Sequence, residues 1–244
     1  RAEDTCETPT TEAAAQPGAY QLFIGPDLAG THEARAQLVS AEITAGGPIF
    51  DELTVTSRII PPNGLTRVKI VTTYRLYHTF DRLDIRNEVE KPVSVEKQQL
   101  DFVFPFRVPG RQYRFETPGV IVNPASDYRP GAGQSVAAVQ SFVDVFNAEF
   151  GVTLATVDSG LIQFGHRTTA EDPLDPDPSN STIRCLALGN CYDWNEAIRD
   201  QGGATHFTFR YSLHAHGGGF DPLAALRFGW EAACNLLAIP LPAG

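Results

Sequence analysis

The first candidates for chemistry in this sequence are two histidines, His214 and His216, in the stretch SLHAH. The stretch alternates as a β-strand does, so both side chains point to one face, about 6.6 to 6.8 Å apart along the chain. Two imidazoles at this spacing can share a cation, but a zinc site needs a third ligand. None of His32, His78 or His166 is placed by the sequence to supply it, so we favour a structural role over metal binding.

Carboxylates near predicted strand ends are the second candidates. Asp127, Asp144 and Asp158 lie where the carboxylate pair of a sugar-cleaving site can be built. Aspartates at strand ends are also ordinary turn residues, and the sequence does not separate the two roles. It contains no Gly-x-Ser-x-Gly, no phosphate-binding glycine loop and no His-Glu-x-x-His.

The spacing of the cysteines allows one local disulfide, between Cys185 and Cys191. The four cysteines form no Cys-x-x-Cys pair. Cys185 and Cys191 flank a turn at Gly189-Asn190 that can bring them together, so a disulfide is expected if the protein is exported. Two separate reduced thiols are the alternative.

Composition excludes several partners. The formal net charge is −10, and no cluster of lysine and arginine is longer than two residues, so nucleic acid and anionic membrane surfaces are not expected to bind. The longest apolar run, LLAIPL, is too short to span a membrane. The chain begins at Arg1 and has no methionine, which indicates a processed product or a segment of a longer protein. The compartment stays open, with secretion favoured.

Periodicity predicts an all-β fold. After an acidic lead-in over residues 1–18, a single domain is expected over 19–244, because short alternating runs follow one another between glycine and proline. Residues 66–92 form a long antiparallel hairpin with one polar face. The apolar stripe of residues 100, 102, 104 and 106 belongs to a sandwich core. The pattern predicts one late helix over 221–237, with Asp221 as N-cap, and hence a large antiparallel β-sandwich with one short helix near the C-terminus.

The order of several segments carries a family resemblance. YRLYHTFDRLDIRNEVEKP, FVFPFRV, YRFETPGVIVNP, VQSFVDVFNAEFGVTLATVDSGLIQFG and the stretch from DQGGATHF to EAACNLL resemble the C-terminal β-sandwich region of glycoside hydrolase family 38, the α-mannosidases, over roughly residues 19–241. The resemblance implies a supersandwich of the galactose-mutarotase-like kind. It also implies that the nucleophilic aspartate and the zinc ligands belong to an N-terminal α/β domain with a His-x-Asp motif, and this chain contains no His-x-Asp.

The resemblance implies a non-catalytic part of a hydrolase of α-mannosidic or related bonds. Its partners would be carbohydrate and a catalytic α/β domain or subunit holding the zinc. His216, followed by Gly217, falls where the family has a strand-ending histidine and glycine, which implies a structural or domain-packing role. Strand-end residues near the sugar are the expected substrate rim: Asp127, Tyr128, Arg129, Asp158 and His166.

A stand-alone β-sandwich that binds carbohydrate or protein without catalysis is the alternative function. Sugar rings stack on exposed aromatic side chains. Tyr128, Tyr192 and Trp194 are the loop aromatics that the sequence offers for this role, and packing within the fold is the competing explanation for each.

Overall fold

A computed structural model describes residues 19–24, 32–60, 67–94, 98–130, 132, 136–165, 180–189 and 202–234. For residues 19–24, 32–35 and 98 it describes the backbone alone. The predicted lead-in over residues 1–18 lies outside the described residues.

The described residues form strands almost throughout, with one helix. The elements in chain order are β1 (Ala19–Ile24), β2 (His32–Gly46), β3 (Phe50–Ile59), β4 (Val68–Tyr77), β5 (Leu83–Glu90), β6 (Gln98–Phe106), β7 (Gln112–Thr117), β8 (Val120–Val122), β9 (Ala137–Ala138), β10 (Phe142–Phe146), β11 (Phe150–Thr156), β12 (Leu161–Phe164), β13 (Ser181–Gly189), β14 (His206–Gly217) and α1 (Pro222–Ala233). The predicted antiparallel β-sandwich with one helix near the C-terminus is confirmed.

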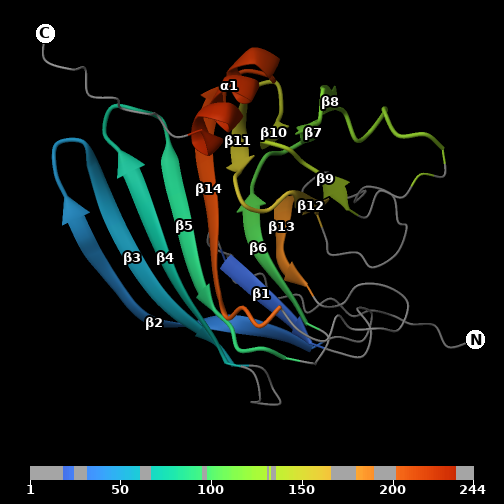
Figure 1. The fold of residues 1–244 in the computed structure, drawn as a ribbon. Coiled ribbons are helices and arrows are strands. Elements are labelled where there is room, and N and C mark those ends of the chain that lie inside the picture. The colour runs from blue at the N-terminus through green and yellow to red at the C-terminus, as the bar shows by residue number, and fades with distance from the viewer. Residues whose placement is uncertain are drawn as a thin grey trace, which may run out of the picture.

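Two layers arise because one long strand turns from the first layer into the second. The strand order is β8-β7-β10-β11-β14-β5-β4-β3-β2-β1-β6-β13-β12-β9, and each neighbouring pair is antiparallel. The start of β2 pairs with β1, whereas its residues from Ala36 onward pair with β3. Two register shifts in β2, characteristic of β-bulges, accompany this change of partner. Figure 1 shows the two layers on either side of this corner.

The core lies between the layers and is rich in aromatic rings. Phe102 and Phe104 of β6 are completely buried, and Phe102 packs against Phe209 and Tyr211 of β14 at centroid distances of 5.6 Å to each ring. Phe104 contacts Tyr211 edge-on at 5.1 Å. These contacts join the two layers, as the apolar stripe in the sequence predicted.

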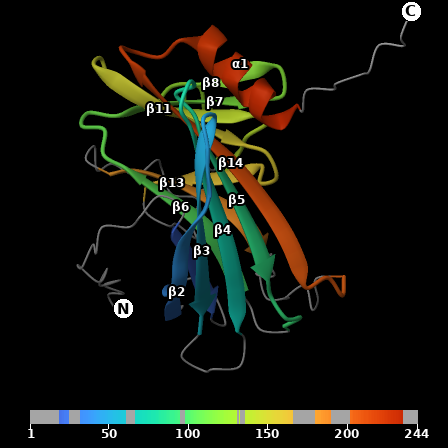
Figure 2. The same ribbon diagram turned by 90° about the vertical axis from the view of Figure 1, so that its left-hand side faces the viewer.

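The first layer extends beyond the second at one end. Along β4 the inward-facing residues change from fully buried Val68 and Ile70 to Leu76, which is 55% exposed. Along β3 they change in the same way, from buried Ile59 to Leu53, which is 38% exposed. The outer ends of the β2–β3 and β4–β5 hairpins therefore project past the second layer. Figure 2 looks onto the outer face, with β2–β5 and β14 in front and β6 and β13 behind.

Helix α1 covers part of the same outer face, beside these hairpins. It begins where the sequence predicted, since the Asp221 carboxylate accepts hydrogen bonds from the backbone N–H groups of Leu223 and Ala224. The helix lies close against β10, because a Cβ atom on Gly229 would come within 3.2 Å of the Phe142 Cβ. None of the helices in the described residues has the length and apolar character needed to cross a membrane.

Candidate functional site

A row of polar side chains crosses four neighbouring strands on the outer face of the first layer. Glu52 of β3 is paired with Arg75 of β4, Arg75 with Asp84 of β5, and Asp84 with Ser212 of β14. Residues that are register partners point to the same face of a sheet, so these four side chains form one line perpendicular to the strands. We call this line the cross-strand row.

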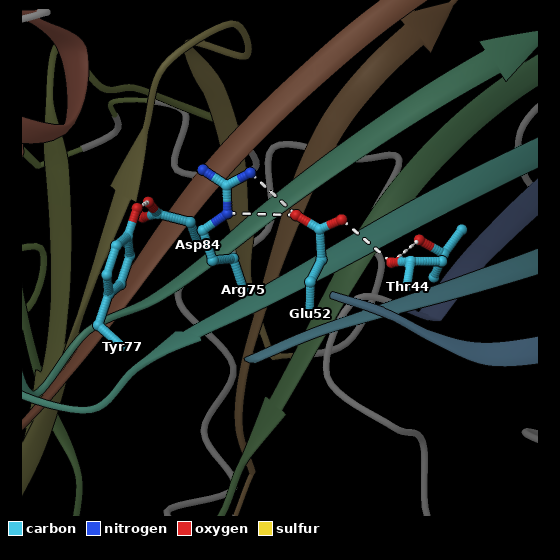
Figure 3. Close-up of polar contacts among 6 residues, drawn as sticks. Thr44, Glu52, Arg75, Tyr77 and Asp84 are labelled. Atoms are coloured by element: carbon cyan, nitrogen blue, oxygen red, sulfur yellow. Dashed lines mark hydrogen bonds and ion pairs between the residues drawn. The ribbon is translucent and has the colours of Figure 1, made fainter. Parts of the chain in front are cut away.

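Glu52 is the acceptor at one end of the cross-strand row. Both Nε and one terminal nitrogen of Arg75 donate to Oε2 of Glu52, at 3.2 and 2.9 Å. Thr44, which lies at a register shift of β2, donates to Oε1 at 3.0 Å. Figure 3 shows Glu52 held between these two side chains. The Arg75 hydrogen bond is the main cause that lowers the pKa of Glu52, so this carboxylate is suited to stay ionised and unsuited to donate a proton.

Asp84 is held in the same manner further along the row. Its Oδ2 accepts from the Tyr77 hydroxyl at 3.0 Å, as Figure 3 shows. Its Oδ1 accepts from Arg82 Nε at 2.6 Å and from the Ser212 hydroxyl at 2.5 Å. Both carboxylates of the row are therefore fixed by donors on neighbouring strands, and the row acts as a cross-link among β2, β3, β4, β5 and β14.

Aromatic rings surround the row at the projecting hairpin ends. The Arg75 guanidinium lies 4.4 Å from the centre of the Phe50 ring, and Phe50 contacts Tyr77 edge-on at 6.1 Å. Tyr77 contacts Phe80 edge-on at 6.0 Å, and Phe80 itself is exposed. The aromatic rings of Phe50, Tyr77 and Phe80 thus extend the cross-strand row to the hairpin ends.

The two histidines singled out by the sequence lie beneath α1 and contact different groups. His216 Nε2 lies 3.1 Å from Oδ2 of Asp144, whereas His214 Nδ1 lies 2.7 Å from the backbone carbonyl of Asp81. His214 also packs against Phe228 of α1 at 5.4 Å. Gly151, the register partner of His216, leaves room for the imidazole, because a Cβ there would come within 2.5 Å of its Cε1.

Asp144, the carboxylate that contacts His216, is buried. It is 1% exposed, and Thr153 donates to its Oδ2 at 2.5 Å. Burial is the main cause that raises its pKa. No group of three or more metal-ligating side chains that could hold an ion occurs in the described residues. The structural role expected for His214 and His216 stays a prediction.

Asp158 is engaged by β14. Arg210 donates to both carboxylate oxygens, through Nε to Oδ2 and through a terminal nitrogen to Oδ1, each at 2.8 Å. The Arg210 backbone N–H donates to Oδ2 at 2.8 Å as well. The side-chain hydrogen bond from Arg210 is the main cause that lowers the pKa of Asp158. Its predicted role at a sugar rim stays a prediction.

The loop after β8 holds the other predicted rim residues. The Asp127 carboxylate closes a turn by accepting from the backbone N–H of Asn123 and from the Ser126 hydroxyl, each at 2.7 Å. Tyr128 packs against the core, and burial raises its pKa. Arg129 is exposed. β8 and β11 run in opposite directions. The loop after β8 and Asp158, which follows β11, therefore lie at opposite ends of the sheet.

Several candidate residues lie outside the described residues: His166, Cys191, Tyr192 and Trp194. Cys185 is completely buried in β13, and burial raises the pKa of its thiol. The structure gives Cys185 as a free thiol, and its expected disulfide partner Cys191 lies outside the described residues. The described part therefore agrees with the alternative of separate reduced thiols.

Two buried carboxylates were missed by the sequence interpretation, Asp101 of β6 and Glu116 of β7. Glu116 of β7 is buried beneath α1, where the Ser141 hydroxyl donates to it and the Trp230 indole forms a side-chain hydrogen bond with it. Burial is the main cause that raises its pKa. The alternation of the motif YRFETPG places Glu116 on the face that a one-sided sheet presents to solvent. Alternation alone therefore predicts an exposed glutamate, and it cannot show that a helix covers this position.

The fold and the site define a class: a two-layer antiparallel β-sandwich whose outer face carries ordered polar and apolar side chains. The family model described as "Glycosyl hydrolases family 38 C-terminal domain" matches residues 15–159, which is more than half of the chain. The chain therefore belongs to that family, as the resemblance in the sequence indicated.

Two solved structures from Enterococcus faecalis have the same fold. One is described as an α-mannosidase and the other as a protein in glycosyl hydrolase family 38, with TM-scores of 0.64 and 0.62 and 12% sequence identity in both. They cover 88% of this chain, whereas the chain covers 27% and 28% of theirs. The chain thus spans a little over a quarter of the length of these structures. Among curated proteins, none matches this sequence.

Proposed function

We propose that this chain is the non-catalytic β-sandwich part of an α-mannosidase-like glycoside hydrolase, and that it acts with a catalytic α/β part to hydrolyse α-mannosidic or related bonds. The match to the family of C-terminal domains carries this proposal. The short span of the chain relative to the similar α-mannosidase agrees with it, because most of that protein has no counterpart here.

The pKa shifts and the burial of the carboxylates support a non-catalytic role. Glycoside hydrolysis needs a general acid whose pKa is raised and a second carboxylate at a fixed separation, both open to the sugar. Glu52 and Asp158 instead have lowered pKa values because arginines bind them. Asp144 and Glu116 have raised pKa values but are buried beneath α1. In this proposal the nucleophile and the zinc belong to the catalytic part.

Hydrolysis of an aryl α-mannoside tests the proposal. The purified chain alone is expected to give the same rate as buffer, with or without added zinc. The assembled protein from the native organism is expected to hydrolyse the substrate and to lose activity to a chelator. Chelator-sensitive turnover by the chain alone would contradict the proposal.

A further inference from the structure

Helix α1 is seated on a layer of polar and ionisable side chains. The helix contacts β10, β11 and β14, and Figure 1 shows it lying over β14 and β11. Two carboxylates are enclosed between the helix and the sheet, since Asp144 is 1% exposed and Glu116 is 6% exposed. A carboxylate loses favourable hydration when it is buried, so a charge on either group opposes the seating of the helix unless a cation compensates it.

Glu116 makes a polar contact between the sheet and α1. The Trp230 indole forms a hydrogen bond with its carboxyl group, and the Ser141 hydroxyl also donates to it. Both donors are uncharged. Arg114, two residues earlier on the same face of β7, has its guanidinium 5.5 Å from the centre of the Phe146 ring. No ion pair with Glu116 occurs in the described residues, so its ionised form is not compensated there.

Asp144 has titratable neighbours on β14 alone. Thr153 donates to its Oδ2 at 2.5 Å, and His216 Nε2 lies 3.1 Å from the same oxygen. Within the described part of the chain, Oδ1 is buried without a hydrogen-bond partner. His214 stacks beside His216 at a centroid distance of 6.4 Å. An imidazolium at His216 compensates an ionised Asp144, so loss of that proton as the pH rises leaves the carboxylate uncompensated.

The other charged groups around α1 are exposed or already paired. Arg227 and Glu231, the charged residues of the helix itself, are exposed, as is its N-cap Asp221. Arg82, which lies 5.9 Å from the ring of Phe228, is paired with Asp84. Strands β8 and β11 contain no charged residue. The charge beneath the helix is therefore set by the two carboxylates and the two histidines.

Little apolar surface holds α1 in place. Of its residues, Ala225 and Gly229 are buried, whereas Leu223 and Trp230 are 56% and 52% exposed. An element with so few buried apolar contacts opens locally at a lower free energy than the strands of a core. Uncompensated charge beneath the helix can therefore release it while the two layers stay packed.

We infer that protonation controls the seating of α1: the helix is docked while Glu116 is protonated and Asp144 is protonated or paired with a histidinium, and rising pH releases it locally. Burial raises the pKa of both carboxyl groups in the docked state. Release returns them to water and to ordinary pKa values of about 4. Docking is thus strongest below about pH 4 and weakens as the pH rises from there through the docked-state pKa values.

Hydrogen–deuterium exchange of the purified chain, read by mass spectrometry, tests this inference. The measured quantity is the protection of the α1 amides, which is the exchange rate of an unstructured peptide divided by that of the helix at the same pH. Protection of α1 is expected to fall about tenfold or more between about pH 5 and pH 8, while the amides of β5 and β6 keep theirs. Constant protection of α1, or an equal fall in the strands, would overturn the inference.

Variants assign the effect to the buried carboxylates. Glu116→Gln keeps the shape without the charge and is expected to reduce the fall, and Asp144→Asn added to it is expected to abolish the fall. Glu88→Gln, which changes an exposed glutamate of β5, is the matched control and should keep the full fall. Each variant is compared with wild type at the same pH, so the contribution of the Asp221 cap cancels.

The single variant decides the outcome if the double variant does not fold. A fall in Glu116→Gln as large as in wild type would then overturn the inference, because the uncompensated carboxylate in contact with α1 would have no effect on the helix. A reduced fall in this variant, with the full fall kept in Glu88→Gln, would support it.

Discussion

Arg210 and Asp158 form a two-pronged ion pair that fastens the end of β11 to β14, with both side-chain hydrogen bonds at 2.8 Å. The Arg210 backbone N–H also donates to the Asp158 carboxylate, and the Val157 backbone N–H donates to the Arg210 carbonyl oxygen. Bidentate pairs of this geometry are stronger than single contacts, because both planar groups are fixed at once. The pair therefore has a structural role in the isolated chain.

Removal of the Asp158 carboxylate is expected to destabilise the chain. Asp158→Ala leaves the Arg210 guanidinium and backbone N–H without this acceptor, and we expect a loss of about 1 to 2 kcal/mol in the free energy of unfolding. Asp158→Asn, which keeps an acceptor, should lose less. Denaturant unfolding measures both, and a stability unchanged in the alanine variant would contradict the structural role.

The contribution of Asp158 should also disappear in acid. Its pKa is lowered in the folded chain, so it stabilises the fold above its unfolded pKa of about 3.9 and loses this effect as the pH falls through the folded value. The difference in unfolding free energy between wild type and Asp158→Asn is expected to shrink steadily below about pH 4. A difference that stays constant down to pH 2 would rule out the ion pair as its source.

Glu116 should show the opposite dependence. Burial raises its pKa above the unfolded value of about 4.3, so ionisation opposes folding as the pH rises from that value through the folded pKa. Glu116→Gln keeps the shape without the charge. The unfolding free energy of this variant, relative to wild type, is expected to increase between about pH 4 and neutral pH. No change over that range would indicate that the carboxylate is not enclosed beneath α1.

Gly151 is expected to tolerate no side chain. A Cβ would lie 2.5 Å from His216 Cε1 and 2.6 Å from Phe146 Cβ, so we expect Gly151→Ala to destabilise the chain by about 1 to 3 kcal/mol. His216→Ala should recover part of that loss in the double variant, because it removes the imidazole but leaves Phe146 in place. Thermal unfolding of the four proteins in this cycle gives the coupling, and strictly additive effects would contradict the contact.

Most strands and the start of the helix could be predicted from the sequence, because the patterns that specify them are local. The hairpin predicted over residues 66–92 is found as β4 and β5, and Asp221 was predicted as the cap that begins α1. Alternation and capping depend on residues a few positions apart, so a single sequence contains them.

The cross-strand row was only partly predictable. Arg75 and Asp84 belong to one hairpin with a short turn, so their pairing follows from closing that turn. Glu52 and Ser212 join the row through strands that are distant in sequence, and no local pattern specifies which strands become neighbours. For the same reason the sequence could indicate that Asp158 ends a strand but could not name Arg210 as its partner.

The central claim is our proposal that this chain supplies no catalytic carboxylate. It is tested most directly by kcat for an aryl α-mannoside in the assembled protein, with Asp127, Asp144, Asp158 and Glu116 changed singly to the corresponding amides at a temperature where each variant is folded. We expect each variant to keep kcat within about threefold of wild type, since loss of a general acid or base lowers rates by roughly 10²- to 10⁴-fold. A loss of that larger size in any one variant would contradict the account.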